Sequence, residues 1–202
     1  MAELVDIYQS VASEGHGLYK DKGSRFISFA YPVESLDEVK EKIDALRKEY
    51  HDARHHCYAY RIGCDGSLFR ANDDGEPSSS AGKPILGQID SAGLSDVLVV
   101  VVRYFGGIKL GVPGLIHAYR TAAADALLSA GSRTKTACRN YRISFDYIST
   151  NDVMKLVKDL SLSILRQEFG EECVIEAAVR LTAEGILKEK VANISSCRLE
   201  EL

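Results

Sequence analysis

The sequence predicts two domains of mixed secondary structure, an α/β domain followed by a smaller α+β domain. Three features support this: an unbroken apolar run at 97–102, a polar stretch at 132–136, and a renewed alternation of strands and helices after it. The β-branched apolar run is typical of a strand covered on both faces. The polar stretch has no apolar periodicity, which favours a linker. We therefore predict domains at residues 1–134 and 135–202.

The first elements of the α/β domain are a strand and a crossover helix. The strand spans 24–31 and ends at Pro32, which cannot donate a ladder hydrogen bond. Ser35 and Glu38 then have the spacing of a capping box. Apolar residues follow at helical spacing, at Val39, Ile43, Leu46 and Tyr50. The pattern predicts a helix that begins after Ser35.

A hairpin, a polar loop and a second helix come next. The hairpin joins strands at 56–62 and 67–71 through Asp65-Gly66, residue types that favour a tight turn with positive φ. The loop spans 72–80, and the helix is expected from Pro84 to about Ser91. The apolar strand follows this helix.

The predicted α+β domain has the order strand, helix, strand, strand, helix, with a possible last strand. Its expected elements are a strand at 140–147, a helix at 150–160 capped by Asn151, an antiparallel pair at 163–169 and 174–181, a helix at 183–194, and a strand within 198–202. This order suits a ferredoxin-like module.

A glycine-rich segment follows the apolar strand and leads into a helix that opens near Pro113 and stops at Gly131. The unpaired N–H groups of a helix N-terminus attract anions. The candidate nucleic-acid-binding or anion-binding residues are Lys83, Arg103, Tyr104, Gly106, Gly107, Lys109, Gly111, Gly114, His117 and Arg120. Alternatively, the glycines only allow a tight turn, and the aromatic residues pack in the core. The segment lacks both the P-loop and the dinucleotide-binding fingerprint.

An acidic turn is the second candidate motif. Asp73, Asp74 and Glu76 lie within four residues and have the oxygen ligands that Mg²⁺ prefers. The alternative is a solvated turn that ends in an N-cap serine. We expect the second arrangement, with a mobile loop whose carboxylates face water, and we predict no metal and no cofactor.

Histidine and tyrosine residues cluster around the second predicted strand. Three histidines lie at 51–56, but a strand places His56 and Cys57 on opposite faces, so three metal ligands do not converge. Tyr58 and Tyr60 share one face. They either stack nucleic-acid bases or pack as ordinary sheet residues.

Two sequence blocks resemble the motifs of the IMPACT/YigZ family. One is Arg103-Tyr104-Phe105-Gly106-Gly107-Ile108-Lys109-Leu110-Gly111, and the other comprises 73–78 and 81–86. The segments 22–28 and 55–61 resemble the family's first two strands. The chain departs from the family pattern where Val112-Pro113 stands in place of Thr-Gly, and at His117 and Arg120, where arginine and glycine are frequent.

The resemblance implies both a fold and a cellular process. It implies that the first domain has the α/β fold shared by a translational elongation factor domain, a small-subunit ribosomal protein domain and the GHMP kinases. The second domain is similar to a ferredoxin-like domain of elongation factor G. Eukaryotic members of the family regulate amino-acid-starvation signalling at translation initiation. They bind their partner through an additional RWD domain, so that partner is not transferred to this chain.

Composition limits the remaining possibilities. The chain has 202 residues and a formal net charge of −4, so a nucleic-acid site must be a local patch. Five cysteines without a Cys-x-x-Cys pair predict neither a disulfide framework nor a thiolate zinc site. We find no signal peptide and no run long enough to span a bilayer, and we expect a cytoplasmic protein.

We therefore expect a non-enzymatic, translation-associated regulator that binds RNA or a ribosome-associated partner through the basic, glycine-rich corner. No motif is specific for DNA. The alternative is a metal-assisted enzyme or binder acting on a small phosphorylated metabolite or nucleotide. In that alternative Lys109 and Arg103 clamp phosphate, and Asp74 or Glu76 is a metal ligand or base. An enclosed pocket favours the enzyme, and an open groove flanked by tyrosines favours nucleic acid.

Overall fold

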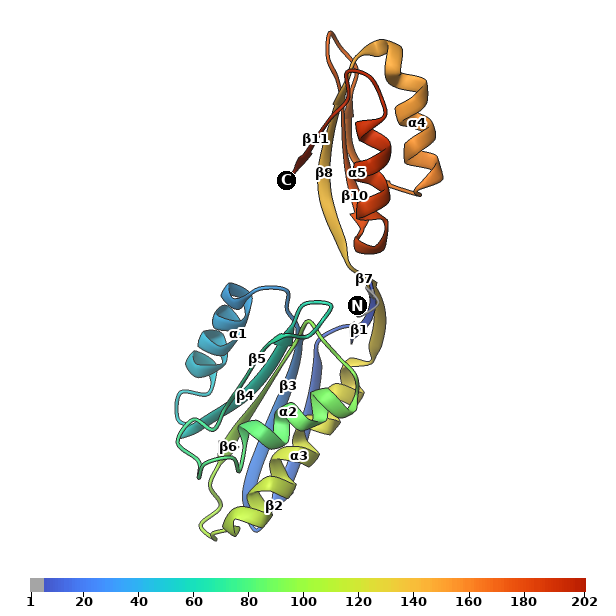
Figure 1. The fold of residues 1–202 in the computed structure, drawn as a ribbon. Coiled ribbons are helices and arrows are strands. Elements are labelled where there is room, and N and C mark those ends of the chain that lie inside the picture. The colour runs from blue at the N-terminus through green and yellow to red at the C-terminus, as the bar shows by residue number, and fades with distance from the viewer. Residues whose placement is uncertain (1–5) are drawn as a thin grey trace. The chain divides into compact units, whose positions relative to one another are not determined.

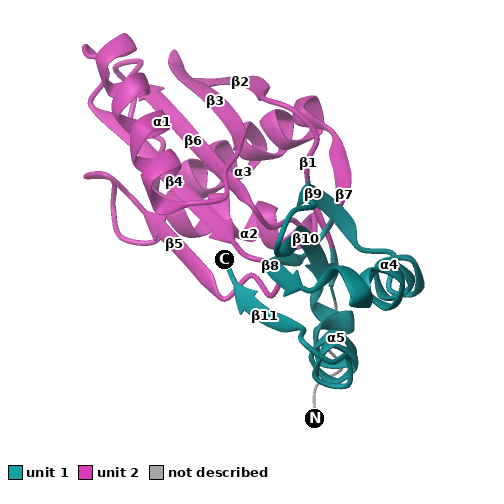
Figure 2. Ribbon diagram, turned by 90° about the horizontal axis from the view of Figure 1, so that it is seen from above, with its two compact units in different colours: residues 1–7, 136–202 teal, residues 8–135 magenta. Residues whose placement is uncertain are grey.

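The computed structural model describes residues 6–202, which divide into two compact units (Figure 2). Unit 2 comprises Tyr8–Lys135, and unit 1 comprises Thr136–Leu202 together with the N-terminal segment up to Ile7. The division along the chain falls next to the predicted boundary. The grouping of the N-terminal segment with the second unit has no counterpart in the sequence prediction.

Unit 2 is built on a five-stranded sheet with the order β2-β3-β6-β4-β5. Its strands are β2 (Gly15–Asp21), β3 (Ser24–Pro32), β4 (His55–Ile62), β5 (Leu68–Asn72) and β6 (Val97–Tyr104). Each neighbouring pair is antiparallel. Because β3 and β4 both pair with β6, they run parallel to each other. Helix α1 (Leu36–Glu49) is therefore the predicted crossover between them (Figure 1).

Helices cover both faces of this sheet (Figure 1). Helices α2 (Gly82–Ser91) and α3 (Gly111–Ala130) pack on one face, and α1 packs on the other. Strand β6 is buried from Val97 to Val102, with alternate residues in the two cores. This arrangement confirms the interpretation of the apolar run as a strand covered on both faces.

The first predicted helix start is largely correct. Ser35 is the N-cap of α1, and its side chain accepts a hydrogen bond from the Glu38 N–H at 3.2 Å. The Glu38 carboxylate accepts from the backbone N–H of Glu34, one residue before the cap, rather than from Ser35 itself. The local spacing thus predicts the helix but not the full hydrogen-bond pattern.

Two N-terminal strands have no counterpart in the sequence prediction. β1 (Ile7–Val11) has no apolar–polar alternation strong enough to indicate a strand, and β2 contains Gly15 and Gly17, which have low strand propensity. β2 joins β3 through Lys22 and Gly23, which have φ values of 45° and 78°. Two consecutive residues with positive φ are the mark of a tight hairpin turn.

The predicted linker is a strand. β7 (Ser132–Thr136) pairs with β1 to form a two-stranded sheet. Lys135 donates to the carboxylates of Asp96 and Glu34, and the Tyr8 hydroxyl donates to Asp96 at 2.5 Å. The polar composition predicts a loop. It misses the strand because the partners of this stretch lie far away in the sequence.

Asp96 is the centre of that cluster, and its replacement tests the cluster's strength. Burial opposes ionisation of this carboxyl, but hydrogen bonds from Lys135, Tyr8 and the Gly63 N–H outweigh it and lower its pKa. Asp96→Asn keeps a side chain that tolerates the φ of 53°. It is expected to lower the free energy of unfolding at neutral pH by about 1–3 kcal/mol, because the Lys135 ammonium loses its buried carboxylate.

The loss of unfolding free energy in Asp96→Asn should depend on pH. Because the pKa of Asp96 is lower in the folded than in the unfolded chain, its contribution is full above the unfolded value of about 3.9 and is lost as the pH falls through the folded value. Urea unfolding of both proteins at neutral and at acid pH measures this. A deficit of equal size at both pH values would assign the loss to amide packing instead of charge.

Unit 1 has a four-stranded antiparallel sheet with the order β11-β8-β10-β9. Its elements are β8 (Cys138–Phe145), α4 (Thr150–Asp159), β9 (Ser163–Glu168), β10 (Cys173–Arg180), α5 (Glu184–Ala192) and β11 (Arg198–Glu201). The order strand, helix, strand, strand, helix, strand agrees with the predicted order, including the last strand. A polar sheet face carries ion pairs such as Arg142 Nη2–Glu176 Oε1 at 2.8 Å.

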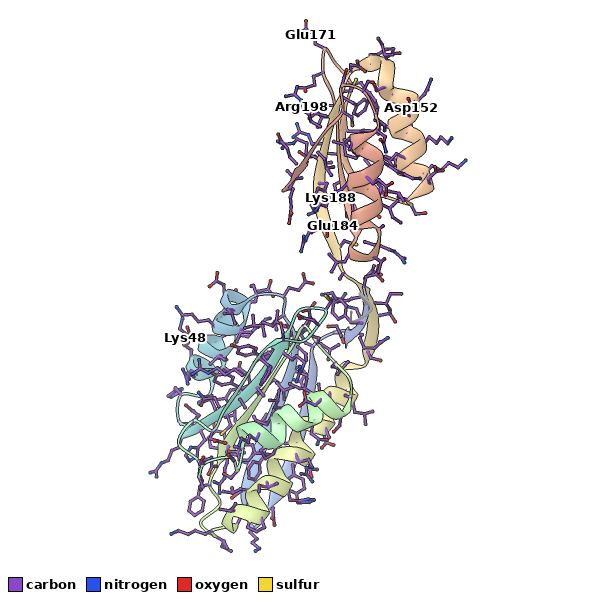
Figure 3. All side chains as sticks on the ribbon, in the orientation of Figure 1. Lys48, Asp152, Glu171, Glu184, Lys188 and Arg198 are labelled. Carbon is purple, nitrogen blue, oxygen red and sulfur yellow. The ribbon has the colours of Figure 1, made fainter. Side chains whose placement is uncertain are left out.

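One predicted cap in unit 1 is wrong. Asn151 lies inside α4, which follows the short 3₁₀ turn Tyr147–Ser149. Asp146 caps that turn, and its carboxylate accepts from the Ser149 N–H at 2.9 Å. On the other helix of this unit Lys188 pairs with Glu184 one turn earlier (Figure 3). The predicted helix start at residue 150 agrees with α4, but the sequence pattern gives no sign of the 3₁₀ turn before it, which carries the capping carboxylate.

Candidate functional site

A buried ion pair lies beneath the glycine-rich segment. The Glu76 Oε1 atom accepts hydrogen bonds from Arg103 Nη1 at 2.5 Å and from the Tyr119 hydroxyl at 2.8 Å. The two charged side chains are only 4% and 7% exposed. Arg103 therefore does not face solvent, and its predicted role as a phosphate clamp is corrected. Glu76 likewise does not face solvent.

The surroundings of Arg103 are aromatic. Its guanidinium lies over the rings of Phe26 and Phe105, with the central carbon 5.4 and 5.6 Å from the ring centroids. Its Nε atom has no hydrogen-bond partner in the described part of the chain. Arg103 thus connects the buried ring of Phe26 and the exposed ring of Phe105 to the acidic loop through the Glu76 carboxylate. This is a structural role.

The buried network continues to a cysteine. The Cys57 thiol lies 3.0 Å from the Asp73 carbonyl oxygen and 3.2 Å from the Tyr119 hydroxyl, and it can donate to one of them at a time. Burial raises the pKa of Cys57, and it also raises the pKa of Tyr119. A protonated, buried thiol is a poor nucleophile. As predicted, Cys57 and His56 lie on opposite faces of β4. Cys57 is in the core beneath α2 and α3, and His56 is on the face that α1 covers.

Asp73 caps helix α2. Its Oδ1 atom accepts from the N–H groups of Ala81 at 3.0 Å and Gly82 at 2.8 Å, and its Oδ2 atom accepts from the Ser79 N–H at 2.8 Å. A carboxylate from a distant part of the loop therefore occupies the place expected for a serine cap. The interaction also complements the positive helix end. Asp73 is not available to a metal.

Asp74 is held by the neighbouring strand and by α1. Its Oδ2 atom accepts from the His56 N–H at 2.6 Å, and its Oδ1 atom accepts from Arg47 Nη2 at 3.2 Å. Within residues 6–202 no three side chains of histidine, cysteine, aspartate or glutamate gather to hold a metal ion. The expectation of a mobile, solvated acidic loop is wrong, because its carboxylates satisfy backbone donors and arginines.

The glycine-rich segment approaches the β2–β3 turn very closely. A Cβ atom at Gly106 would lie 1.9 Å from the backbone carbon of Gly23, so no side chain fits there. The Gly106 N–H donates to the Ser24 hydroxyl at 3.1 Å. Beyond this contact the segment is exposed, with Phe105 at 54% and Ile108 at 56%. The glycines thus serve a cramped turn, and the segment's tip lies at the surface.

Neither aromatic residue of this segment is buried in the core. The Tyr104 hydroxyl donates to Asp52 at 2.6 Å, and this bond to a carboxylate raises the pKa of Tyr104 to about 12. Arg25 lies over its ring, 4.9 Å from the centroid. Phe105 is more than half exposed. The alternative in which both residues pack as core aromatics is therefore not what the structure shows.

An open groove between α2 and α3 brings two of the predicted cations together. Lys83 at the start of α2 and Arg120 on α3 both line this cavity of about 510 Å³. The rest of the lining is polar or apolar but uncharged: Ser79, Pro84, Gly87, Gln88, Ser91 and Ile116. We call this the α2–α3 groove. It has the cations and hydroxyl groups that contact phosphate oxygens.

The other candidate residues lie outside that groove. Lys109 is exposed in the segment before α3, and His117 packs edge-on against Tyr19 at a centroid distance of 5.7 Å. Gly111 is the first residue of α3 and has a φ of 71°, and Gly114 lies in the first turn. Gly107 has a φ of 89°, and a Cβ atom added there would have open space around it, with no other atom within 4 Å. Of the predicted residues, only Lys83 and Arg120 line this groove.

The two strand tyrosines pack rather than stack. Tyr58 and Tyr60 are 9% and 7% exposed in the core beneath α1, on the opposite face of the sheet from the α2–α3 groove. Their ring faces are therefore not open to nucleic-acid bases. The expected combination of an open groove with flanking tyrosines is only half present, because the groove is open but the tyrosines lie elsewhere.

Comparison with known proteins identifies the family. The family model described as the Impact N-terminal domain matches residues 22–127, which include both motifs and the α2–α3 groove. The chain belongs to the IMPACT family. It is 31% identical to the IMPACT family member YigZ of Escherichia coli over 183 residues, which are 90% of each chain. This IMPACT family chain therefore shares most of its length with a bacterial relative.

Solved structures extend the comparison. A crystal structure described as a hypothetical protein covers 98% of both chains at 29% identity, with a TM-score of 0.72. The structure described as the two-domain translational regulator Yih1 is 30% identical over 61% of this chain and 47% of that chain, with a TM-score of 0.37. Only the first of these supports the fold described here.

Sequence reasoning missed several residues of the site. Tyr119 follows the buried stripe of α3, so its spacing indicated packing and gave no sign of the hydrogen bond to Glu76. Ser79, Gln88 and Ser91 line the groove only because α2 packs on α3. In α2 the residues Lys83, Gly87 and Ser91 are spaced four apart and so share one face, but the predicted helix begins at Pro84 and leaves Lys83 outside it.

Proposed function

We propose that this IMPACT family chain is a translation-associated regulator that binds RNA through the α2–α3 groove. The translational setting follows from the family, whose eukaryotic members the resemblance links to translation initiation. The phosphate backbone of RNA would contact Lys83 and Arg120, with the Ser79 hydroxyl and the Gln88 amide as further hydrogen-bond donors. We propose no catalytic role.

The observation that carries this proposal is the charge of the groove lining. Two basic side chains and no carboxylate line the cavity. Unit 2 as a whole has as many basic as acidic side chains, so the formal net charge of −4 lies on unit 1. A local excess of positive charge on a neutral unit favours a defined contact with a polyanion over general adsorption.

The double variant Lys83→Ala with Arg120→Ala tests the proposal. Affinity for a single-stranded RNA oligonucleotide decreases as the salt concentration rises. The slope of log affinity against log salt concentration is expected to become less negative by about 1.4, because two phosphate contacts are lost at roughly 0.7 each. Fluorescence anisotropy titrations over a range of salt concentrations measure the slope. Both side chains are exposed, so the unfolding midpoint should not change.

A matched control uses two cations outside the groove. Lys48→Ala with Arg133→Ala removes the same charge from exposed positions on α1 and β7, and it should leave the slope within error of wild type. If both double variants change the slope equally, RNA binding depends on net charge and not on the α2–α3 groove. Absence of RNA binding by wild type at low salt would refute the proposal directly.

The alternative enzyme on a small phosphorylated metabolite or nucleotide has less support. Its intended base or metal ligands, Asp74 and Glu76, are engaged by His56, Arg47 and Arg103. The groove is an open surface feature and not an enclosed pocket. If a mononucleotide binds saturably and displaces the RNA at equal concentration of phosphate groups, the small-molecule alternative replaces the RNA proposal.

The proposal includes two fold relationships and a cellular location. We propose that unit 2 has the α/β fold shared with the GHMP kinases and an elongation factor domain, and that unit 1 is a ferredoxin-like module, a relationship that its strand order β11-β8-β10-β9 supports. We place the protein in the cytoplasm, where translation occurs. No helix within residues 6–202 has the length and hydropathy needed to cross a bilayer.

A further inference from the structure

Strand β5 lies at the margin of the unit 2 sheet. It pairs with β4 in antiparallel register, with Arg70 opposite Tyr60 and Leu68 opposite Ile62. Its outer edge has no partner strand in the part of the chain described. The backbone N–H and C=O groups of such an edge can pair with an added strand, which is a recurring mode of peptide recognition.

A groove runs between α1 and the β4–β5 side of the sheet. Its volume is about 350 Å³, and its lining includes Val39, Ile43, Tyr58 and Tyr60. Leu36, in the first turn of α1, also lines it and is 48% exposed. We call this the α1–β5 groove. An edge strand beside a helix-lined apolar groove can hold the backbone of a peptide and one of its side chains together.

The charge of the α1–β5 groove is positive. Lys40, Arg47 and Arg70 line it, against the single carboxylate of Asp44. Lys40 and Arg70 form no ion pair among residues 6–202, while Arg47 shares a partly exposed pair with Asp74 at 3.2 Å. Complementary charge at the rim of an interface selects the partner and speeds association.

We propose that the α1–β5 groove binds a short acidic peptide segment of a partner protein, which adds to β5 as a strand and inserts an aliphatic side chain. A nucleic acid fits this surface less well, because the rings of Tyr58 and Tyr60 are 9% and 7% exposed and offer no face for stacking. The free N–H and C=O groups along the edge of β5 pair with donors and acceptors that repeat at strand spacing, and the backbone of a peptide has these groups.

This site is independent of the proposed RNA contact. The α1–β5 groove lies on the face of the sheet that α1 covers, and the α2–α3 groove lies on the other face. The two grooves share no lining residue. Peptide binding and RNA binding can therefore be tested independently, each with its own variants.

The test selects peptides without assuming their sequence. A phage-displayed library of random peptides of about ten residues is selected against the full chain, which covers the usual length of an added strand. Selected peptides should be acidic and should contain an aliphatic residue. The double variant Lys40→Glu with Arg70→Glu should weaken the best peptide at least about tenfold, because its charges then repel the ligand.

Two controls make the result specific. Lys48→Glu with Arg133→Glu makes the same change in net charge at exposed positions that do not line the groove, and it should leave the peptide affinity unchanged (Figure 3 labels Lys48). Peptide binding should also slow hydrogen exchange at β5 amides in wild type, because the added strand accepts hydrogen bonds from them.

Three outcomes would overturn the proposal. These are selection of peptides that are neutral or basic, an equal loss of affinity with the control Lys48→Glu with Arg133→Glu, or protection from hydrogen exchange that appears only on elements other than β5. Weakening of RNA binding by Lys40→Glu with Arg70→Glu, without selection of acidic peptides, would assign the groove to nucleic acid and would also refute it.

Discussion

Replacement of Glu76 by alanine is expected to lower the free energy of unfolding by about 3–5 kcal/mol. The variant leaves the Arg103 guanidinium 7% exposed without its carboxylate, and it also removes the acceptor of the Tyr119 hydroxyl. Burial of an unpaired charge is costly because the group loses its hydration and gains no compensating interaction in the protein. Urea unfolding followed by circular dichroism gives the change in free energy.

Two further variants separate the charge from the packing. Glu76→Leu with Arg103→Met removes both charges together, and the loss should be much smaller than for Glu76→Ala, since no unpaired charge remains. Glu14→Ala breaks the exposed pair with Lys42 and should cost less than about 1 kcal/mol. If the double variant is as unstable as Glu76→Ala, cavity formation and not the ion pair accounts for the loss.

The variant Gly106→Ala is expected to lower the free energy of unfolding by about 3 kcal/mol. The new methyl group would lie 1.9 Å from the Gly23 carbon and 2.1 Å from the Ser24 nitrogen, and backbone atoms cannot move aside as a flexible side chain can. The β2–β3 turn and the glycine-rich segment would have to separate. Urea unfolding measures the loss, and hydrogen exchange should be fastest at these two segments.

Gly87→Ala is the matched control for this substitution. Gly87 is in the middle of α2, and nothing lies within 4 Å of its added Cβ atom. Helix propensity therefore predicts a gain of about 0.5–1 kcal/mol. Opposite signs for the two glycine variants would show that close backbone approach, rather than glycine content, limits stability. A neutral Gly106→Ala would mean that the turn can open without cost.

Elements with strong local patterns are predictable from the sequence. The run of Val97–Val102 identifies β6, and the spacing after Ser35 identifies α1, because burial on one or two faces leaves a direct pattern in the residues. The composition of β7 predicts a linker because its stability comes from pairing with β1 and from the contact of Lys135 with Asp96, and neither contact leaves a local trace in the sequence. Pairing between distant segments is the information that a single sequence lacks.

The candidate site is less predictable than the fold. The residue types point to a cluster of cations around the start of α3, but burial decides which of them meet solvent. Arg103 is directed inward because its partner Glu76 lies there, in a loop that is distant in the chain. Lys83 and Arg120 share a cavity because α2 packs on α3. Charge alone does not distinguish a structural arginine from a surface arginine.

Unit 1 is assembled from two ends of the chain, and this affects the order in which a ribosome can complete the two units. The Asp6 carbonyl accepts from the Ala137 N–H at 2.6 Å, and the Asp6 carboxylate accepts from the Thr182 hydroxyl at 2.5 Å. All of unit 2 is synthesised before either of these partners exists. Asp6 is therefore synthesised before all of unit 2, but its partners Ala137 and Thr182 are synthesised only after unit 2.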